Sequence, residues 1–213
     1  MRTDDLVLML ARGPIAVASR AVERRFVFGM AWGLAGSAGL MIVLLGVRAD
    51  LAHAALLPMF WIKLAFAGSL ALMAFFLVLR LARPGSRLGS LSVLTALPVL
   101  LLWALATVSL YQAENHERTA LVLGQTWAVC STLIALLSSP VFVGVFAAMK
   151  DMAPTRPRLA GAAAGLLAGA TGTLVYCIHC PEMDAPFLGV WYVLGMLIPV
   201  GVGAALGSRF LRW

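Results

Sequence analysis

The chain has 213 residues, of which 62% are hydrophobic and only 12% charged, and its formal net charge is +7. A soluble globular domain carries about twice that charged fraction and could not bury this much apolar surface, so a soluble protein is excluded. The basic residues are spread over several loops rather than gathered on one face. This distribution argues against direct nucleic-acid binding and suits anionic membrane lipid as a partner.

Residues 1–25 are predicted to form a cytoplasmic N-terminal segment rather than a cleaved signal peptide. They are too polar for a signal, and the apolar run behind them is too long. The segment can begin a short helix with acidic residues in its first turn and apolar residues on one face. That face would either lie on lipid or dock a cytoplasmic partner, and composition does not separate the two. The candidate partner-binding residues are Thr3, Asp4, Asp5, Leu6, Met9 and Leu10.

Residues 26–213 are predicted to form one all-α domain, a polytopic transmembrane bundle of six helices. Each apolar run reaches roughly the 20 residues that a helix needs to cross the hydrocarbon core. The runs are Phe26–Val47, Leu56–Leu79, Leu91–Leu110, Ala120–Met149, Leu159–Cys177 and Phe187–Gly207. All lysines and arginines except Arg48, Lys63 and Arg118 fall in the terminal segments or in every second loop. The positive-inside rule then predicts that both termini are cytoplasmic, as in a multi-pass protein of the bacterial inner membrane.

Small residues at four-residue spacing predict close helix packing rather than a site. The positions are Gly29 and Gly33, Gly161, Gly165 and Gly169, and Gly203 and Gly207. The same glycines could serve contacts within one chain or between copies, so the oligomeric state stays open. Prolines such as Pro140 are expected to kink their helices, with Ser138 and Ser139 satisfying the freed carbonyls.

Lys63 is the one charged residue inside the predicted spans. The simplest interpretation is that its side chain snorkels to the lipid headgroups, and the alternative is an ion pair with Glu182 or Asp184. No span carries an acidic residue or histidine deep in the core, which disfavours a pump or a coupled transporter.

The three cysteines are the remaining candidates for chemistry. Cys130 is predicted to lie about ten residues into the fourth span, Cys177 to close the fifth, and Cys180 to be exposed in the loop beyond. The Cys-x-x-Cys spacing of Cys177 and Cys180 is typical of dithiol redox sites, and His179 could lower a thiol pKa there. With His179 and Glu182, Cys130 and Cys180 could also bind a thiophilic metal ion. The alternative for Cys130 and Cys177 is that they are small buried hydrophobes.

Motifs for enzymatic phosphate, acyl or zinc chemistry are absent from the sequence, so neither an enzyme nor a cofactor is predicted. Two rival classes stay open beside a sensor. One is a membrane thiol–disulfide oxidoreductase that uses Cys177 and Cys180. The other is a small-solute channel or transporter.

Several stretches match a known family in their order and spacing. They are Met1-Arg-Thr-Asp-Asp-Leu6, Phe60-Trp-Ile-Lys-Leu64, Arg83-Pro-Gly85, Trp127-Ala-Val-Cys130 and Tyr176-Cys-Ile-His-Cys180-Pro-Glu182. With them the chain resembles the bacterial negative-regulator-of-sigma-F family, which comprises six-span membrane anti-sigma factors.

The resemblance implies a protein that holds an extracytoplasmic-function sigma factor at the inner membrane and releases it on a stress signal. It also implies that the family's two cysteines correspond to Cys130 and Cys180, and that Cys177 is an addition of this sequence. The candidate sensing residues are therefore Cys130 and Cys180, with Cys177 beside them as a further candidate.

Overall fold

The computed structural model describes residues 19–82, 89, 91–150, 152 and 154–211, and this part of the chain contains helices and no strand. The all-α prediction is confirmed. In chain order the elements are α2 (Ser19–Leu40), the π-helical η1 (Met41–Leu45), α3 (Leu51–Ala54), α4 (Pro58–Leu81), α5 (Leu91–Leu94), α6 (Leu97–Gln112), α7 (Arg118–Leu123), α8 (Trp127–Lys150), α9 (Pro157–Tyr176), α10 (Ala185–Phe187), the π-helical η2 (Leu188–Tyr192) and α11 (Val193–Phe210).

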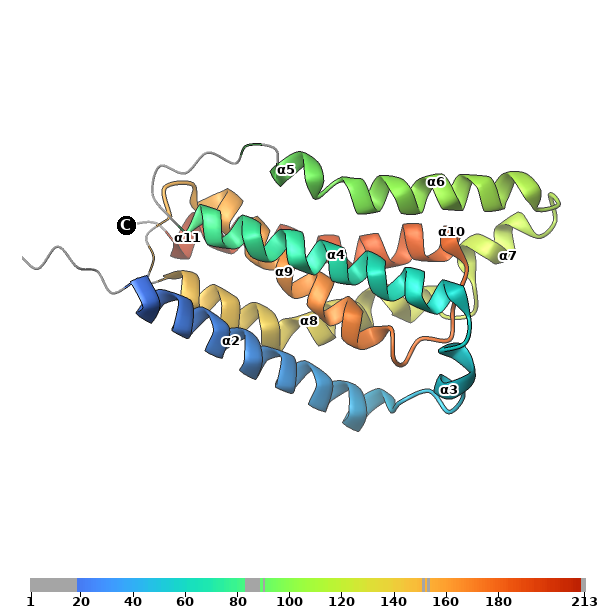
Figure 1. Cartoon of the computed structure of the whole chain (residues 1–213), viewed down its shortest axis with the longest axis horizontal. Helices are drawn as coiled ribbons and strands as arrows, with labels where there is room; N and C mark the ends of the chain where they lie inside the picture. Colours follow the sequence, from blue (N-terminus) through green and yellow to red (C-terminus); the bar gives the residue numbers. More distant parts are fainter. Residues whose placement is uncertain (1–18, 83–88, 90, 151, 153, 212–213) are drawn as a thin grey trace, which may run out of the picture.

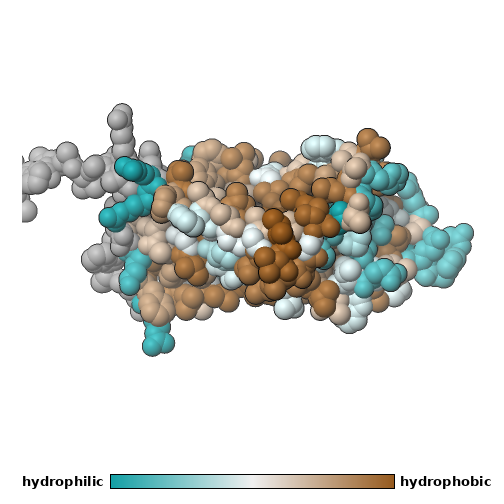
Figure 2. Space-filling view, turned by 90° about the horizontal axis from the view of Figure 1, so that it is seen from below, coloured by the Kyte–Doolittle hydropathy of each residue, from teal (hydrophilic) through white to brown (hydrophobic). Residues whose placement is uncertain are grey.

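Within the described part of the chain, five helical segments are long and apolar enough to cross a membrane. They are Arg24–Leu45, Pro58–Leu81, Arg118–Lys150, Pro157–Tyr176 and Ala185–Phe210. The third apolar run of the sequence instead gives a four-residue helix, a break at Thr95 and Ala96, and the shorter α6. Six full spans therefore stay a prediction. Apolar side chains cover the middle of the molecule in Figure 2, and hydrophilic residues lie at its two ends, as expected of a bundle that crosses a bilayer.

The long helices run up and down the bundle, so α2 begins and α11 ends at the same end (Figure 1). We call this end the basic end, because it carries Arg24, Arg25, Arg80, Lys150, Arg158 and Arg209. The opposite end holds α3, α7, and the loop between α9 and α10 (Figure 1). We call it the cysteine end, because Cys177 and Cys180 lie in that loop.

The fourth apolar run contains a break that hydropathy does not reveal. Gly124 has φ +57°, a left-handed conformation that favours glycine, and it separates α7 from α8. A side chain at this position would also meet Phe187 and the carboxylate of Glu182. The helix that carries Cys130 therefore begins later than the apolar run predicts. Cys130 is the fourth residue of α8 and lies close to the cysteine end.

α9 lies at the centre of the bundle, with most of its residues buried. The predicted packing role of its glycines is confirmed. A Cβ added at Gly161 would collide with the Gly203 carbonyl on α11, and one at Gly165 would collide with the Pro199 carbonyl. α2 and α8 meet in the same way where Gly29 faces Gly144. Backbones in direct contact leave α9 little room to tilt against α11.

Pro140 lies inside α8 and has no N–H for the carbonyl of Leu136, four residues earlier. The Ser139 hydroxyl donates a hydrogen bond to that carbonyl over 2.7 Å. The predicted compensation by a neighbouring serine is therefore confirmed. Ser138 also donates to a main-chain carbonyl, that of Ile134, over 2.6 Å.

Candidate functional site

The most densely hydrogen-bonded feature of the cysteine end is the short loop after α9. We call residues 178–182 the Cys180 segment. It begins where α9 ends, and the Cys180 N–H donates a hydrogen bond to the Tyr176 carbonyl over 3.0 Å. Its other contacts join it to three elements that are distant in sequence, namely the loop after η1, the helix α4 and the turn between α7 and α8.

All three cysteines are free thiols, and each is fully buried. The expectation that Cys180 is exposed is therefore wrong. Cys130, Cys177 and Cys180 belong to one apolar cluster together with Tyr176 and Tyr192. Because α8 begins later than the sequence predicts, Cys130 reaches the same end of the bundle as the other two. The structure thus brings the three candidate sensing residues together, away from water.

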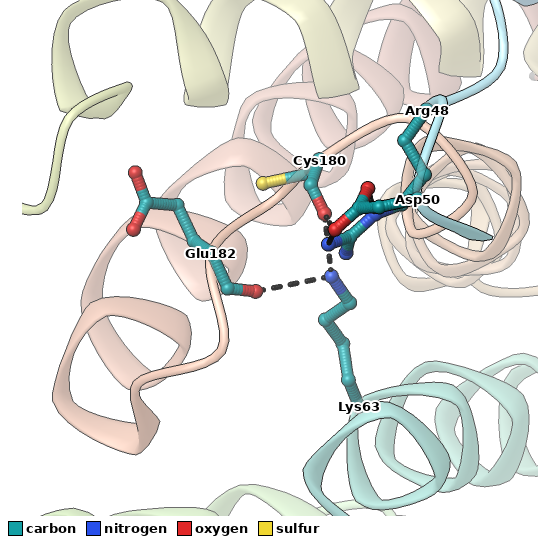
Figure 3. Close-up of polar contacts among 5 residues, drawn as sticks. All are labelled: Arg48, Asp50, Lys63, Cys180 and Glu182. Carbon is teal, nitrogen blue, oxygen red and sulfur yellow. Dashed lines mark hydrogen bonds and ion pairs between the residues drawn. The ribbon is translucent and has the colours of Figure 1, made fainter. Parts of the chain in front are cut away.

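Lys63, on the second turn of α4, is also fully buried, so its interpretation as a snorkelling side chain is wrong. Its Nζ donates hydrogen bonds to the carbonyls of Cys180, over 2.9 Å, and of Glu182, over 3.1 Å. The ammonium also lies 6.0 Å from the centre of the Tyr192 ring. The alternative of an ion pair with Glu182 identified the right residue but the wrong group, because the main-chain oxygen is the acceptor (Figure 3). Two carbonyls and a ring face solvate this cation in place of water.

Arg48 is the second cation on the Cys180 segment. Its Nη1 donates to the Cys180 carbonyl over 3.2 Å, so that one oxygen accepts hydrogen bonds from both Arg48 and Lys63 (Figure 3). The guanidinium also binds both carboxylate oxygens of Asp50, each at 2.7 Å. This hydrogen-bonded pair lowers the pKa of Asp50 to about 2. Two residues before Arg48, the Gly46 carbonyl lies 2.9 Å from the Nδ1 of His179.

Glu182 connects the Cys180 segment to the turn before α8. Its carboxylate accepts hydrogen bonds from the Gln125 N–H over 2.7 Å and from the Thr126 N–H over 3.1 Å, and the Thr126 hydroxyl lies at 3.3 Å. Because α8 carries Cys130, this carboxylate fixes the start of that helix relative to Cys180. Nearby, burial and the charge of Glu182 raise the pKa of Asp184.

The Tyr192 hydroxyl is a buried polar group without a hydrogen-bond partner among the described residues. Tyr192 ends the π-helical turn η2, and its ring packs against Tyr176 with a centroid separation of 5.8 Å. π-helical turns inside α-helices frequently mark functional sites. The π-helical turn η2 places the unsatisfied hydroxyl of Tyr192 in the cluster that contains the three thiols.

The described residues contain no group of three His, Cys, Asp or Glu side chains that could hold a metal ion. His179 faces Gly46, and the Glu182 carboxylate faces the turn before α8, so neither joins Cys130 and Cys180 in a ligand set. The candidate partner-binding residues Thr3, Asp4, Asp5, Leu6, Met9 and Leu10 lie outside the described residues.

Three features of this site escaped the sequence analysis: the double use of the Cys180 carbonyl, the carboxylate-bound turn and the orphan hydroxyl of Tyr192. A charged pair at i, i+2, Arg48 and Asp50, was the visible sign of the first. The second had a sign in Gly124 and Thr126, which interrupt an apolar run directly before Trp127. Tyr192 carried no such sign.

Comparison with known proteins finds similarity over nearly the whole length of the chain. The model of the family described as "Negative regulator of sigma F" matches residues 10–213. The protein described as "Probable anti-sigma-F factor NrsF" of Azospira oryzae is 54% identical over 213 residues, which cover 100% of both chains. "Anti-sigma-F factor NrsF" of Caulobacter vibrioides is 38% identical over 219 residues, again covering 100% of both chains. No solved structure matches the chain.

Proposed function

This chain belongs to the family of negative regulators of sigma F, and from this membership we propose that it is a membrane-bound anti-sigma factor of the bacterial inner membrane. It holds an extracytoplasmic-function sigma factor at the inner membrane face and releases it when a stress signal reaches its cysteines. The observation that carries the proposal is the full-length match to two relatives that are both named anti-sigma-F factors.

The basic end of the bundle is the cytoplasmic one in this proposal. Positively charged residues stay on the cytoplasmic side of membrane proteins, and arginines and lysines gather where α2 begins and α11 ends. The N-terminal segment then lies in the cytoplasm, where a sigma factor is found. The three thiols lie at the other end, near the compartment in which an external stress arises.

The sigma factor docks on the N-terminal segment, around Thr3 to Leu10. The helix predicted from the sequence would present an apolar stripe behind an acidic first turn, which suits a partner helix. Deletion of residues 3–12 is expected to abolish repression while the membrane helices still insert. Retained repression in that deletion would move the docking surface to the loops of the basic end.

Sensing uses Cys130 and Cys180. Because the two resting thiols are buried, they do not react with reagents in solution. A signal must therefore reach the cluster and then force it to repack. Disulfide formation would remove two protons and two electrons from the two thiols, with an external oxidant as acceptor. A disulfide between them would pull the Cys180 segment toward α8. Full burial of all three thiols also disfavours a thiol oxidoreductase, which needs a sulfur open to its substrate.

The test is affinity purification of the full chain from mild detergent, with and without a thiol oxidant. We expect a sigma factor to copurify and to leave on oxidation. Serine at Cys130 or at Cys180 should keep the sigma factor bound under oxidant, whereas Cys177→Ser, the matched control, should behave as wild type. Absence of any sigma factor in the purified material would refute the anti-sigma function. Release from both sensing variants would refute only the cysteine mechanism.

A further inference from the structure

The cation Lys63 depends on the Cys180 segment for its solvation. It is fully buried, and no carboxylate forms an ion pair with it within the described part of the chain. The carbonyls of Cys180 and Glu182 are its hydrogen-bond acceptors. A buried charge that loses its acceptors is strongly disfavoured, so Lys63 must follow these carbonyls when they move.

The Cys180 residue faces two ways. In Figure 3 its sulfur points away from Lys63, whereas its carbonyl points toward both Lys63 and Arg48. The sulfur and the oxygen that both cations bind belong to the same residue. A change at the sulfur that turns this peptide therefore acts first on the hydrogen bonds of the two cations.

Of the two cations, Lys63 belongs to a helix that runs the length of the bundle. α4 contains 24 residues, which correspond to about 36 Å at 1.5 Å per residue. Buried residues recur along its whole length, from Phe60 near the cysteine end to Val78 near the basic end. A packed helix moves as one body, so a displacement at Lys63 reaches the last turn of α4 at the basic end (Figure 1).

We propose that Lys63 is the coupling residue that transmits a change at Cys180 to α4, and through α4 to the basic end of the bundle. This inference rests on the proposed function, because the basic end is where the sigma factor would be held. Lys63 binds no signal itself. It acts by position, as a cation that keeps α4 in register with the Cys180 segment.

The test is a set of full-length variants with a sigma-dependent reporter, read without inducer and normalised to the amount of the protein in the membrane. Lys63→Met removes the cation and keeps the side-chain length. We expect basal reporter activity to rise by about tenfold or more, since loss of a hydrogen bond to a charged group shifts an equilibrium by at least that factor. Lys63→Arg, the matched control, keeps a cation with several donors and should stay near wild type.

Combination with a cysteine variant shows whether Lys63 acts after the thiol. In Lys63→Met with Cys180→Ser, the reporter should stay high with or without inducer, because Lys63 acts after the thiol. Cys180→Ser alone should stay low under both conditions. If the double variant is repressed like Cys180→Ser, Lys63 does not transmit the signal.

A second position keeps the test open if Lys63→Met does not accumulate in the membrane. Arg48→Gln removes the other cation from the Cys180 carbonyl and leaves Lys63 in place. We expect Arg48→Gln to raise basal reporter activity, but by less than complete derepression would. A reporter identical to wild type in Arg48→Gln would then overturn the inference. Equal reporter activity in every strain, including one without the protein, would instead mean that the chain does not repress at all, and the proposed function would fail.

Discussion

Glu182 offers the most direct test of how the cysteine end is held together. Its carboxylate accepts the N–H groups of Gln125 and Thr126, and its exposed fraction is 8%. Glu182→Ala leaves both N–H groups without this acceptor. An unsatisfied buried donor costs roughly 1–3 kcal/mol, and Gln125 is exposed enough for water to replace part of its bond. We therefore expect a loss of about 2–3 kcal/mol in the free energy of unfolding.

The substitution Glu182→Gln refines this expectation. The amide keeps an oxygen that can accept both N–H groups but lacks the negative charge. Because charge-assisted hydrogen bonds are about twice as strong as neutral ones, we expect a loss of about 1 kcal/mol. The free energy of unfolding should thus decrease in the order wild type, Glu182→Gln, Glu182→Ala. This order is specific to a carboxylate that binds main-chain donors.

The assay is reversible unfolding of the purified protein in mild detergent by added sodium dodecyl sulfate, followed by tryptophan fluorescence. Trp127 and Trp191, whose ring centres lie 5.5 Å apart, report directly on this region. Glu117→Ala is the matched control, since Glu117 lies at the same end, is exposed, and makes no side-chain capping bond to α7. Equal stability losses in Glu117→Ala and Glu182→Ala would refute the assigned role of this carboxylate.

Three further predictions address other parts of the molecule. Gly165→Ala should cost about 1–3 kcal/mol in the same unfolding assay, because the added methyl meets the backbone of α11, whereas Gly39→Ala, in open space, should be neutral or stabilising. The carboxylate carbon of Asp50 should titrate in NMR near pH 2. Arg48 lowers the pKa of Asp50, so the ion pair stabilises the folded protein fully above the ordinary pKa of 3.8, and this stabilisation is lost as the pH falls through 2. Titration of Asp50 near 3.8 would contradict the pairing. A water-soluble maleimide should leave Cys180 and the other two thiols unlabelled in the folded protein and label all three after unfolding, and labelling at equal rates in both states would contradict their burial.

The sequence was sufficient to predict the all-α class and five of the six long apolar helices, because a long apolar run in a membrane can satisfy its backbone groups only as a helix. It was insufficient where a local conformation interrupts a run. Gly124 adopts a left-handed φ that ends one helix and starts the next, yet hydropathy averages over it. Because α8 begins later than predicted, Cys130 lies at the same end of the bundle as Cys177 and Cys180. The expected geometry of the three thiols was wrong for this reason.

Lys63 shows a different limit. Sequence reasoning assigns a lone lysine near the end of a span to the headgroups, because water and phosphate are the partners it can foresee. The actual partners are carbonyls 117 and 119 residues further along the chain. Such partners exist only once α4 and α9 are packed side by side, so no local pattern predicts them. The burial of Cys180 has the same origin, since the loop that carries it folds inward onto Lys63 and Arg48.

The energies available at the Cys180 segment are of the size that a switch requires. Moving a two-state equilibrium from 1:99 to 99:1 takes about 5.5 kcal/mol. Lys63 makes two hydrogen bonds from a charged group, and each contributes roughly 1.5–3 kcal/mol. Loss of both would therefore supply between half and all of the required change, before any effect of Arg48 or Glu182. In the proposed coupling, a single cation on α4 would thus be strong enough to bias the bundle between two packings, while the glycine contacts of α9 with α11 would keep the rest of the bundle in place.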